Sequence, residues 1–303
     1  MRKNKLMISA ITLAFAVVAV VSTTFAWFTM NTTNTVEDMD FTATSGSGLY
    51  MSLDGTNYYT SLNINHFKDF ALASGNENKI KGFKNGENLN PVTLLADGTT
   101  LATSTKSVAT TGYVQFTLHF KSSVKSTVKV SDLTLKTVFA EDVIAPSVTL
   151  NDVSEFWDAH GASEGSIKLE TVLANAARVK VEAIDGETKA SQYIDPNLNA
   201  GYKGIETVLA NSVSHQYLNH VSPKEAKEIV SKYGENVSSV IYTDYKGLQD
   251  TTLLTLKQSG EEFVGSVTVT LWIEGFDQDC FDVLFKQNLT FGISFEATKV
   301  EQQ

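Results

Sequence analysis

Three stretches of this chain alternate apolar and polar residues with a period of two, at 113–121, 266–274 and 289–297. This alternation is typical of β-strands that have one face in a core and the other in solvent. The positions predicted to face the core are Val114, Phe116, Leu118, Phe120, Val267, Val269, Leu271, Ile273, Leu289, Phe291, Ile293, Phe295 and Ala297. On the opposite, solvated face of the second stretch we expect Thr268, Thr270 and Trp272. The chain is therefore expected to form antiparallel sheets.

Weaker patterns extend this prediction along the chain. Further strands are expected at 36–44, 48–53, 128–138, 148–150 and 178–183, with turns at Asp54-Gly55 and Asp97-Gly98. Helical signals are restricted to 222–234, which opens with the capping sequence Ser222-Pro223-Lys224-Glu225, and to a short segment near 151–157. The pattern predicts an all-β fold, an antiparallel β-sandwich of jelly-roll type with a few short helices in the connections.

Length and composition are compatible with one large domain. The chain has 303 residues, of which 42% are hydrophobic, and it contains no visible internal repeat or proline-rich linker. We expect a single β-sandwich domain over 37–303. Two polar, weakly periodic stretches near 61–112 and 185–260 are interpreted as insertions.

The first 26 residues have the features of a secretory signal peptide. Basic residues at positions 2, 3 and 5 precede an uncharged apolar run, and small residues at Thr24 and Ala26 predict cleavage between Ala26 and Trp27. An uncleaved membrane anchor is the alternative, but the apolar stretch over 6–21 is shorter than the roughly 20 residues of a spanning helix. The sequence thus predicts a secreted protein that meets a signal peptidase during export.

Charge and cysteine content narrow the class of protein further. The formal net charge is −10, and loss of the basic signal peptide would make the mature form more acidic. An acidic surface repels phosphate backbones, so nucleic acid is not expected as a partner. The single cysteine, Cys280, excludes an internal disulfide. A free or intermolecular thiol remains open, and a small semi-buried residue without chemistry is the favoured interpretation.

A search for catalytic patterns finds no zinc-protease, phosphate-loop or nucleophile-elbow motif. The histidines are scattered at positions 66, 119, 160, 215 and 220, with no spacing that brings three ligands together. We therefore expect no catalytic activity, no resident cofactor and no zinc. One weak calcium candidate exists, because Glu274, Asp277 and Asp279 lie close together around Gly275. A solvated acidic turn is the competing interpretation.

Three segments resemble one family of secreted proteins. Residues 23–29, Thr-Thr-Phe-Ala-Trp-Phe-Thr, are similar to the signal peptides processed by the specialised signal peptidase SipW. Residues 291–298, Phe-Gly-Ile-Ser-Phe-Glu-Ala-Thr, resemble the closing strand of TasA, a biofilm-matrix fibre protein of Gram-positive bacilli, and of its relative camelysin. Residues 272–275 and the Asp279-Cys280 pair resemble a motif of surface proteins that carry such signal peptides.

The TasA resemblance implies a jelly-roll subunit that is exported, trimmed and assembled into extracellular fibres at the cell surface or in the matrix. It also implies that the new N-terminal arm, residues 27–36, completes the sheet of a neighbouring copy. The arm has no charge, and Trp27, Phe28, Met30 and Val36 are the apolar residues that would serve this contact. The implied partners are further copies of the chain and accessory matrix or anchoring proteins. An intramolecular first strand is the alternative.

Two other functions remain open. A monomeric surface adhesin or ligand-binding sandwich could use exposed aromatics such as Tyr58, Tyr59 or Trp157 as platforms. Camelysin has been described as a metallopeptidase, but the missing zinc motif gives that function little support in this chain.

Overall fold

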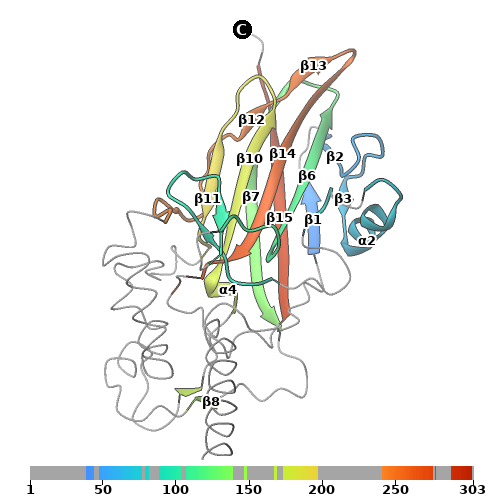
Figure 1. Cartoon of the computed structure of the whole chain (residues 1–303). Helices are drawn as coiled ribbons and strands as arrows, with labels where there is room; N and C mark the ends of the chain where they lie inside the picture. Colours follow the sequence, from blue (N-terminus) through green and yellow to red (C-terminus); the bar gives the residue numbers. More distant parts are fainter. Residues whose placement is uncertain are drawn as a thin grey trace, which may run out of the picture.

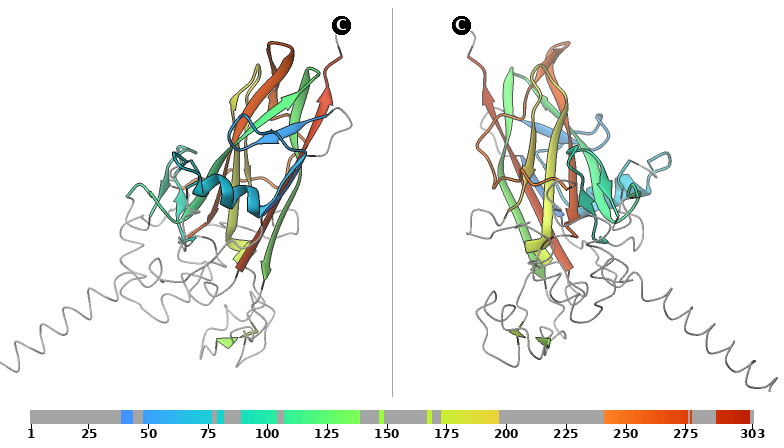
Figure 2. Two further views of the ribbon diagram at one scale, coloured as in Figure 1. Left: turned by 90° about the vertical axis from the view of Figure 1, so that its right-hand side faces the viewer. Right: turned by 60° about the vertical axis from the view of Figure 1, so that its left-hand side comes forward.

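The structure is a computed structural model in which two β-sheets pack face to face (Figures 1 and 2). It describes residues 39–43, 48–76, 79–81, 89–103, 107–138, 147–148, 167–168, 173–196, 241–275, 277 and 288–301. Most described residues lie in strands of antiparallel sheets, with only two short helices. The predicted all-β sandwich is therefore confirmed.

The five-stranded sheet contains, in spatial order, β12 (Leu254–Thr255), β7 (Ser126–Val138), β15 (Asn288–Lys299), β1 (Met39–Ala43) and β3 (Ser61–Leu62). The six-stranded sheet contains β11 (Ser191–Ile194), β10 (Ala177–Asp185), β14 (Glu262–Ile273), β6 (Tyr113–Ser122) and β2 (Tyr50–Ser52), with β13 (Lys257–Ser259) paired to β14. The remaining elements are the pairs β4 (Thr93–Leu94) with β5 (Leu101–Ala102) and β8 (Ser147–Val148) with β9 (Ile167–Lys168), and the helices α2 (Ile64–Leu72) and α4 (Leu173–Ala176).

The strand order is that of a jelly roll. One sheet contains the order β1-β15-β7-β12, and the other contains the order β6-β14-β10-β11. These are the two four-stranded orders of a jelly roll when its eight strands are numbered along the chain. One pairing departs from this antiparallel architecture: β1 runs parallel to β15, with Met39 opposite Phe291 and Ala43 opposite Phe295. The N-terminal strand thus occupies the expected place in the sheet but runs in the opposite direction.

The core lies between the two sheets and follows from the alternation of the long strands. In β15, Phe291 and Phe295 are fully buried, and the ring of Phe295 packs edge-on against Phe120 of β6 with centroids 5.0 Å apart. From α2, Phe67 packs in the same way on Phe116 at 5.0 Å. Every core-facing position predicted in the three alternating stretches is buried. Burying one Phe or Leu side chain contributes about 1.5–3 kcal/mol, so this layer supplies the main stabilisation.

The outer face of the six-stranded sheet carries a second apolar cluster, and here two predictions are wrong. Thr270 and Trp272, both expected to be solvated, are buried. Trp272 is fully excluded from solvent. It packs with neighbours from β4, β5 and the segment around Tyr245, and this cluster contains Val92, Leu94, Leu101, Ala109, Tyr113, Tyr245 and Trp272. Period-two alternation assigns residues to two faces, but it does not reveal that a distant segment covers the second face.

Parts of the two stretches interpreted as insertions belong to the sandwich itself. Within 61–112, β3 joins the five-stranded sheet and α2 contributes Phe67 to the core. Within 185–260, β11 and β12 are sheet strands. The predicted turns at Gly55 and Gly98 are present, with φ values of 74° and 68° that favour glycine. The helices predicted near 151–157 and at 222–234 lie outside the described residues.

Candidate functional site

The N-terminal strand and its seat form the first candidate site. Backbone pairing places β1 between β15 and β3, with Phe41 opposite Ile293 on one side and Leu62 on the other. Two residues separate the end of the predicted arm from Met39, the first described residue of β1. The arm residues Trp27, Phe28, Met30 and Val36, and the predicted cleavage site at Ala26, lie outside the described residues. The structure therefore describes the strand that continues the arm, and it places that strand inside a sheet of its own chain.

The two neighbours of β1 differ in length. β15 has twelve residues, and its ladder with β7 runs from Asn288 to Lys299. β3 has two residues, both paired with β1. Parallel pairing is slightly less stable per residue than antiparallel pairing. Hence β1 is a short parallel strand on a long, well-supported neighbour.

The acidic residues at the end of β14 form a buried polar network, so the expected solvated turn is wrong for Glu274 and Asp277. Both side chains are fully excluded from solvent. Glu274 Oε2 accepts hydrogen bonds from Trp272 Nε1 at 3.2 Å and from the Tyr245 hydroxyl at 3.4 Å. The backbone N–H of Leu94 also donates to Oε2, at 3.4 Å. This carboxylate therefore connects β14, the Tyr245 segment and β4.

Asp277 takes part in a buried ion pair with Arg178 of β10. The same guanidinium lies 3.0 Å from Asp195 Oδ2 and donates to the backbone oxygens of Asn175 and Ala177. We call Arg178, Asp195 and Asp277 the Arg178 cluster. Its carboxylates bind a guanidinium, which is a structural role, and the third residue of the calcium prediction, Asp279, lies outside the described residues. Within the described ranges no group of three or more metal-ligating side chains is arranged around a common point.

The electrostatics of this network affect Tyr245. Burial raises the pKa of its hydroxyl well above the ordinary value, and the nearby Glu274 carboxylate raises it further, while Arg178 acts in the opposite direction. The Tyr245 ring also lies 5.5 Å from the Arg178 guanidinium carbon. Tyr245 therefore stays protonated and serves as a hydrogen-bond donor to Glu274.

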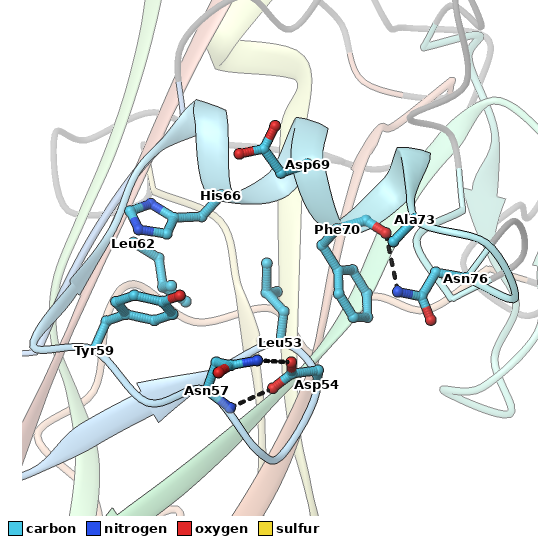
Figure 3. Close-up of a pocket in the computed structure, with 10 residues that line it drawn as sticks. All are labelled: Leu53, Asp54, Asn57, Tyr59, Leu62, His66, Asp69, Phe70, Ala73 and Asn76. Atoms are coloured by element: carbon cyan, nitrogen blue, oxygen red, sulfur yellow. Dashed lines mark hydrogen bonds between the residues drawn. The ribbon is translucent and has the colours of Figure 1, made fainter.

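A groove beside α2 is the second candidate site (Figure 3). It has a volume of about 250 Å³ and is lined by Leu53, Asp54, Asn57, Tyr59, Leu62, His66, Asp69, Phe70, Ala73 and Asn76. Tyr59 and His66 stand together at one side, with ring centroids 4.6 Å apart, and Phe70 lies across the groove in Figure 3. We call this hollow the α2 groove. It combines an apolar floor with a polar rim.

Local sequence explains how the rim is held. Asn63 caps α2: its side chain accepts from the backbone N–H groups of Asn65 and His66, and the His66 ring accepts from the Asn63 N–H at 3.1 Å. On the facing turn, burial acts to raise the pKa of Asp54, but hydrogen bonds from Asn57, Thr56 and Ser52 outweigh it and lower this pKa. Asp54 therefore remains ionised and fixes the turn.

The aromatic residues predicted as ligand platforms differ in exposure. Tyr59 is 42% exposed and lines the α2 groove. Tyr58 is half-buried, and the Lys121 ammonium lies 4.7 Å from its ring centroid. Trp157 lies outside the described residues, as do His160, His215, His220 and Cys280. Of the predicted platforms, Tyr59 is thus the one that the structure places in a groove.

The Arg178 cluster could not be predicted from residue spacing in the sequence. Arg178 and Asp277 are separated by 99 residues, and an arginine at the start of a predicted strand is usually solvent-facing. On the same strand, the Lys180 ammonium lies 5.3 Å from the ring centroid of Tyr193, its directly paired neighbour on β11. Arg178, Asp195 and Asp277 meet because β11 and β14 both pair with β10, next to Arg178.

Comparison with known proteins gives no match to a family model, to a curated protein or to a solved structure. Within the described residues, the structure contains no helix long and apolar enough to cross a membrane.

Proposed function

We propose that this chain is a secreted structural subunit of an extracellular matrix or surface fibre, and that subunits join when the N-terminal arm of one copy adds to the sheet of the next. The observation that carries this proposal is the parallel seat of β1 on β15. In an antiparallel jelly roll, the strand at this position is expected to run the other way. The same slot can therefore accept a strand of opposite direction.

The energetic argument concerns exchange of one strand for another. β1 pairs with β15 over five residues in the parallel direction. An incoming arm of ten residues that pairs antiparallel would form the more stable ladder geometry over a greater length. Each residue adds about 3.4 Å, so the ten-residue arm would extend about 34 Å and could pair along most of the twelve residues of β15. Exchange of β1 for a longer antiparallel strand therefore favours assembly.

The composition of the arm fits this role. Residues 27–36 carry no charge and contain four threonines and two asparagines, so no charged side chain has to be buried when the arm enters a sheet. Its aromatic start, Trp27-Phe28, provides large apolar side chains that gain free energy by filling pockets in a neighbour.

Deletion of the arm tests the proposal. A chain that begins at Glu37 keeps every residue the structure describes, so we expect a folded, soluble monomer that unfolds cooperatively on heating. Loss of folding on deletion would instead indicate an intramolecular strand. As a direct test, a synthetic peptide of residues 27–36 should bind the arm-less chain, and a scrambled peptide should not. Binding should change the fluorescence of Trp27, the single tryptophan of the peptide.

The α2 groove favours one alternative, a monomeric adhesin that binds a small ligand such as a glycan. Tyr59 offers an exposed ring beside the polar groups of Asn57 and His66, a combination suited to a sugar ring. A glycan-binding screen separates the two functions. Binding that is lost in Tyr59→Ala but kept in Tyr50→Ala, an equally exposed tyrosine outside the groove, would support the adhesin.

A further inference from the structure

The outer edge of β7 is covered for only part of its length. β12 pairs with Thr127 and Val128, and neighbouring backbone bonds reach Ser126 and Val128. Beyond Val128, Figure 1 shows β7 continuing past the short β12. On its other side, β15 pairs along the whole strand. Among the residues that the structure describes, none pairs with the outer edge of 130–138. Within the described part of the chain, this segment therefore has backbone groups without a strand partner on its outer side, and such groups are a template for a further strand.

A bulge separates the covered part of this edge from the open part. The register with β15 shifts so that Ser294 faces Asp132 while Phe295 faces Val130, and Ser131 is the extra residue. After the bulge, Leu133 and Leu135 pack against the core and remain only half-buried, whereas Asp132 and Lys136 are exposed. The open edge consequently has an apolar inner face and a charged outer face.

The sequence of this edge is complementary to itself. If two copies of β7 meet in antiparallel orientation about a two-fold axis at Thr134, Asp132 of each copy lies opposite Lys136 of the other. In the same register Leu133 lies opposite Leu135, so both half-buried leucines gain an apolar neighbour. Opposite charges and apolar pairs placed directly across two strands are each stabilising. A single register therefore pairs opposite charges on the outer face and leucines on the inner face.

We propose that the 130–138 edge is a self-association surface, through which two copies of this chain form a two-fold dimer by antiparallel β7–β7 pairing. The charges select this occupant. The uncharged arm, residues 27–36, would leave Asp132 and Lys136 without opposite charges, whereas a second copy of the same edge supplies one for each. Within the described residues neither side chain takes part in an ion pair that would compete.

This contact is independent of strand addition at β1. β7 and β1 lie on opposite sides of β15 in the five-stranded sheet, so both contacts can form on one subunit. The dimer contact would join subunits side by side, and strand addition would join them end to end.

A disulfide across the two-fold axis reports the β7–β7 contact whether or not the chain also assembles into fibres. In a Cys280→Ser background, Thr134→Cys places two cysteines directly opposite each other, and we expect a disulfide-linked dimer in a glutathione redox buffer. Lys136→Cys is the matched control on the same face. The two 136 positions would lie about 14 Å apart along the strands, too far for a disulfide.

Charge reversal then tests the register. Asp132→Lys and Lys136→Asp each place like charges opposite one another twice in the dimer, and we expect each to lower the equilibrium yield of the Thr134→Cys link about tenfold. The double reversal, Asp132→Lys with Lys136→Asp, restores opposite charges and should restore the yield. That restoration also shows that the reversed chains fold.

Three results would overturn the proposal: no link at position 134, equal links at 134 and 136, or yields that do not respond to charge reversal. Failure of fibre assembly would leave this test unchanged, because the link joins two copies of one position and does not involve the arm.

Discussion

The guanidinium of Arg178 lies 3.0 Å from the carboxylate of Asp195, with both side chains excluded from solvent. Asp277 binds the same guanidinium from the opposite side of β10, because β11 and β14 flank this strand in the six-stranded sheet. The three residues come from β10, from the residue that follows β11, and from the segment after β14. The Arg178 cluster therefore connects the neighbouring strands β11, β10 and β14 at one end of the sheet.

Removal of this cation should be strongly destabilising. Arg178→Ala leaves two buried carboxylates without their guanidinium, and breaking such a buried pair costs about 3–5 kcal/mol. We expect that loss in the free energy of unfolding measured with urea. Lys246→Ala is the control, because its pair with Asp244 is exposed and should contribute less than about 1 kcal/mol. Equal effects of the two substitutions would contradict a structural role for the Arg178 cluster.

Gly98 should be less tolerant of substitution than Gly260, although the two have almost the same backbone conformation. Their φ values are 68° and 64°. A Cβ at Gly98 would lie 2.9 Å from the Tyr193 hydroxyl oxygen, whereas a Cβ at Gly260 would meet nothing within 4 Å. Gly260→Ala should cost about 1–2 kcal/mol from backbone strain alone. Gly98→Ala should lower the thermal midpoint further, and a smaller effect than that of Gly260→Ala would show that the Tyr193 contact is absent.

The α2 groove should depend on its helix cap. Asn63→Ala removes the side-chain acceptor for the N–H groups of Asn65 and His66, and loss of such a cap costs about 1 kcal/mol. Hydrogen exchange of the first turn of α2 should quicken, while exchange in β6 stays unchanged. Asn65→Ala is the control, because Asn65 lies two positions after Asn63 in the first turn and its side chain has no capping role. Equal exchange in both variants would contradict the capping box.

Acid should weaken the turn around Asp97. Hydrogen bonds from Thr100 and Thr99 lower the pKa of this carboxyl to about 2. Because the folded-state pKa is lower than the unfolded one, the ionised form adds stability that is present above about pH 4 and is lost as the pH falls towards 2. Thr100→Val removes the hydroxyl donor and should flatten this part of the pH profile of unfolding. A profile as steep as that of the parent would contradict the assignment.

The sandwich could be predicted because its strands are long and regular. β6 and β15 bury alternate residues, and the core-facing positions of β14 are buried as predicted, so Phe116, Val269 and Phe291 were placed correctly from periodicity alone. The helix α2 was not predicted, because it has only nine residues and its cap pairs Asn63 with His66, where the usual capping box has Glu or Gln.

The polar sites could not be predicted, because they depend on which distant segments meet. Glu274 and Asp277 have the spacing of an acidic loop, and only the positions of Trp272 and Arg178 in space decide that both carboxylates are buried. The direction of β1 has the same origin. A strand pattern at 36–44 predicts a strand, but it carries no information on whether that strand runs parallel or antiparallel to β15.

Negative-stain electron microscopy of the chain that begins at Trp27, followed over time and across salt concentration and pH, tests the central claim most directly. The account predicts regular filaments with an axial repeat close to the length of one domain, and no filaments from the chain that begins at Glu37. A protein that stays monomeric when concentrated or seeded would contradict the fibre-subunit proposal and favour the ligand-binding sandwich.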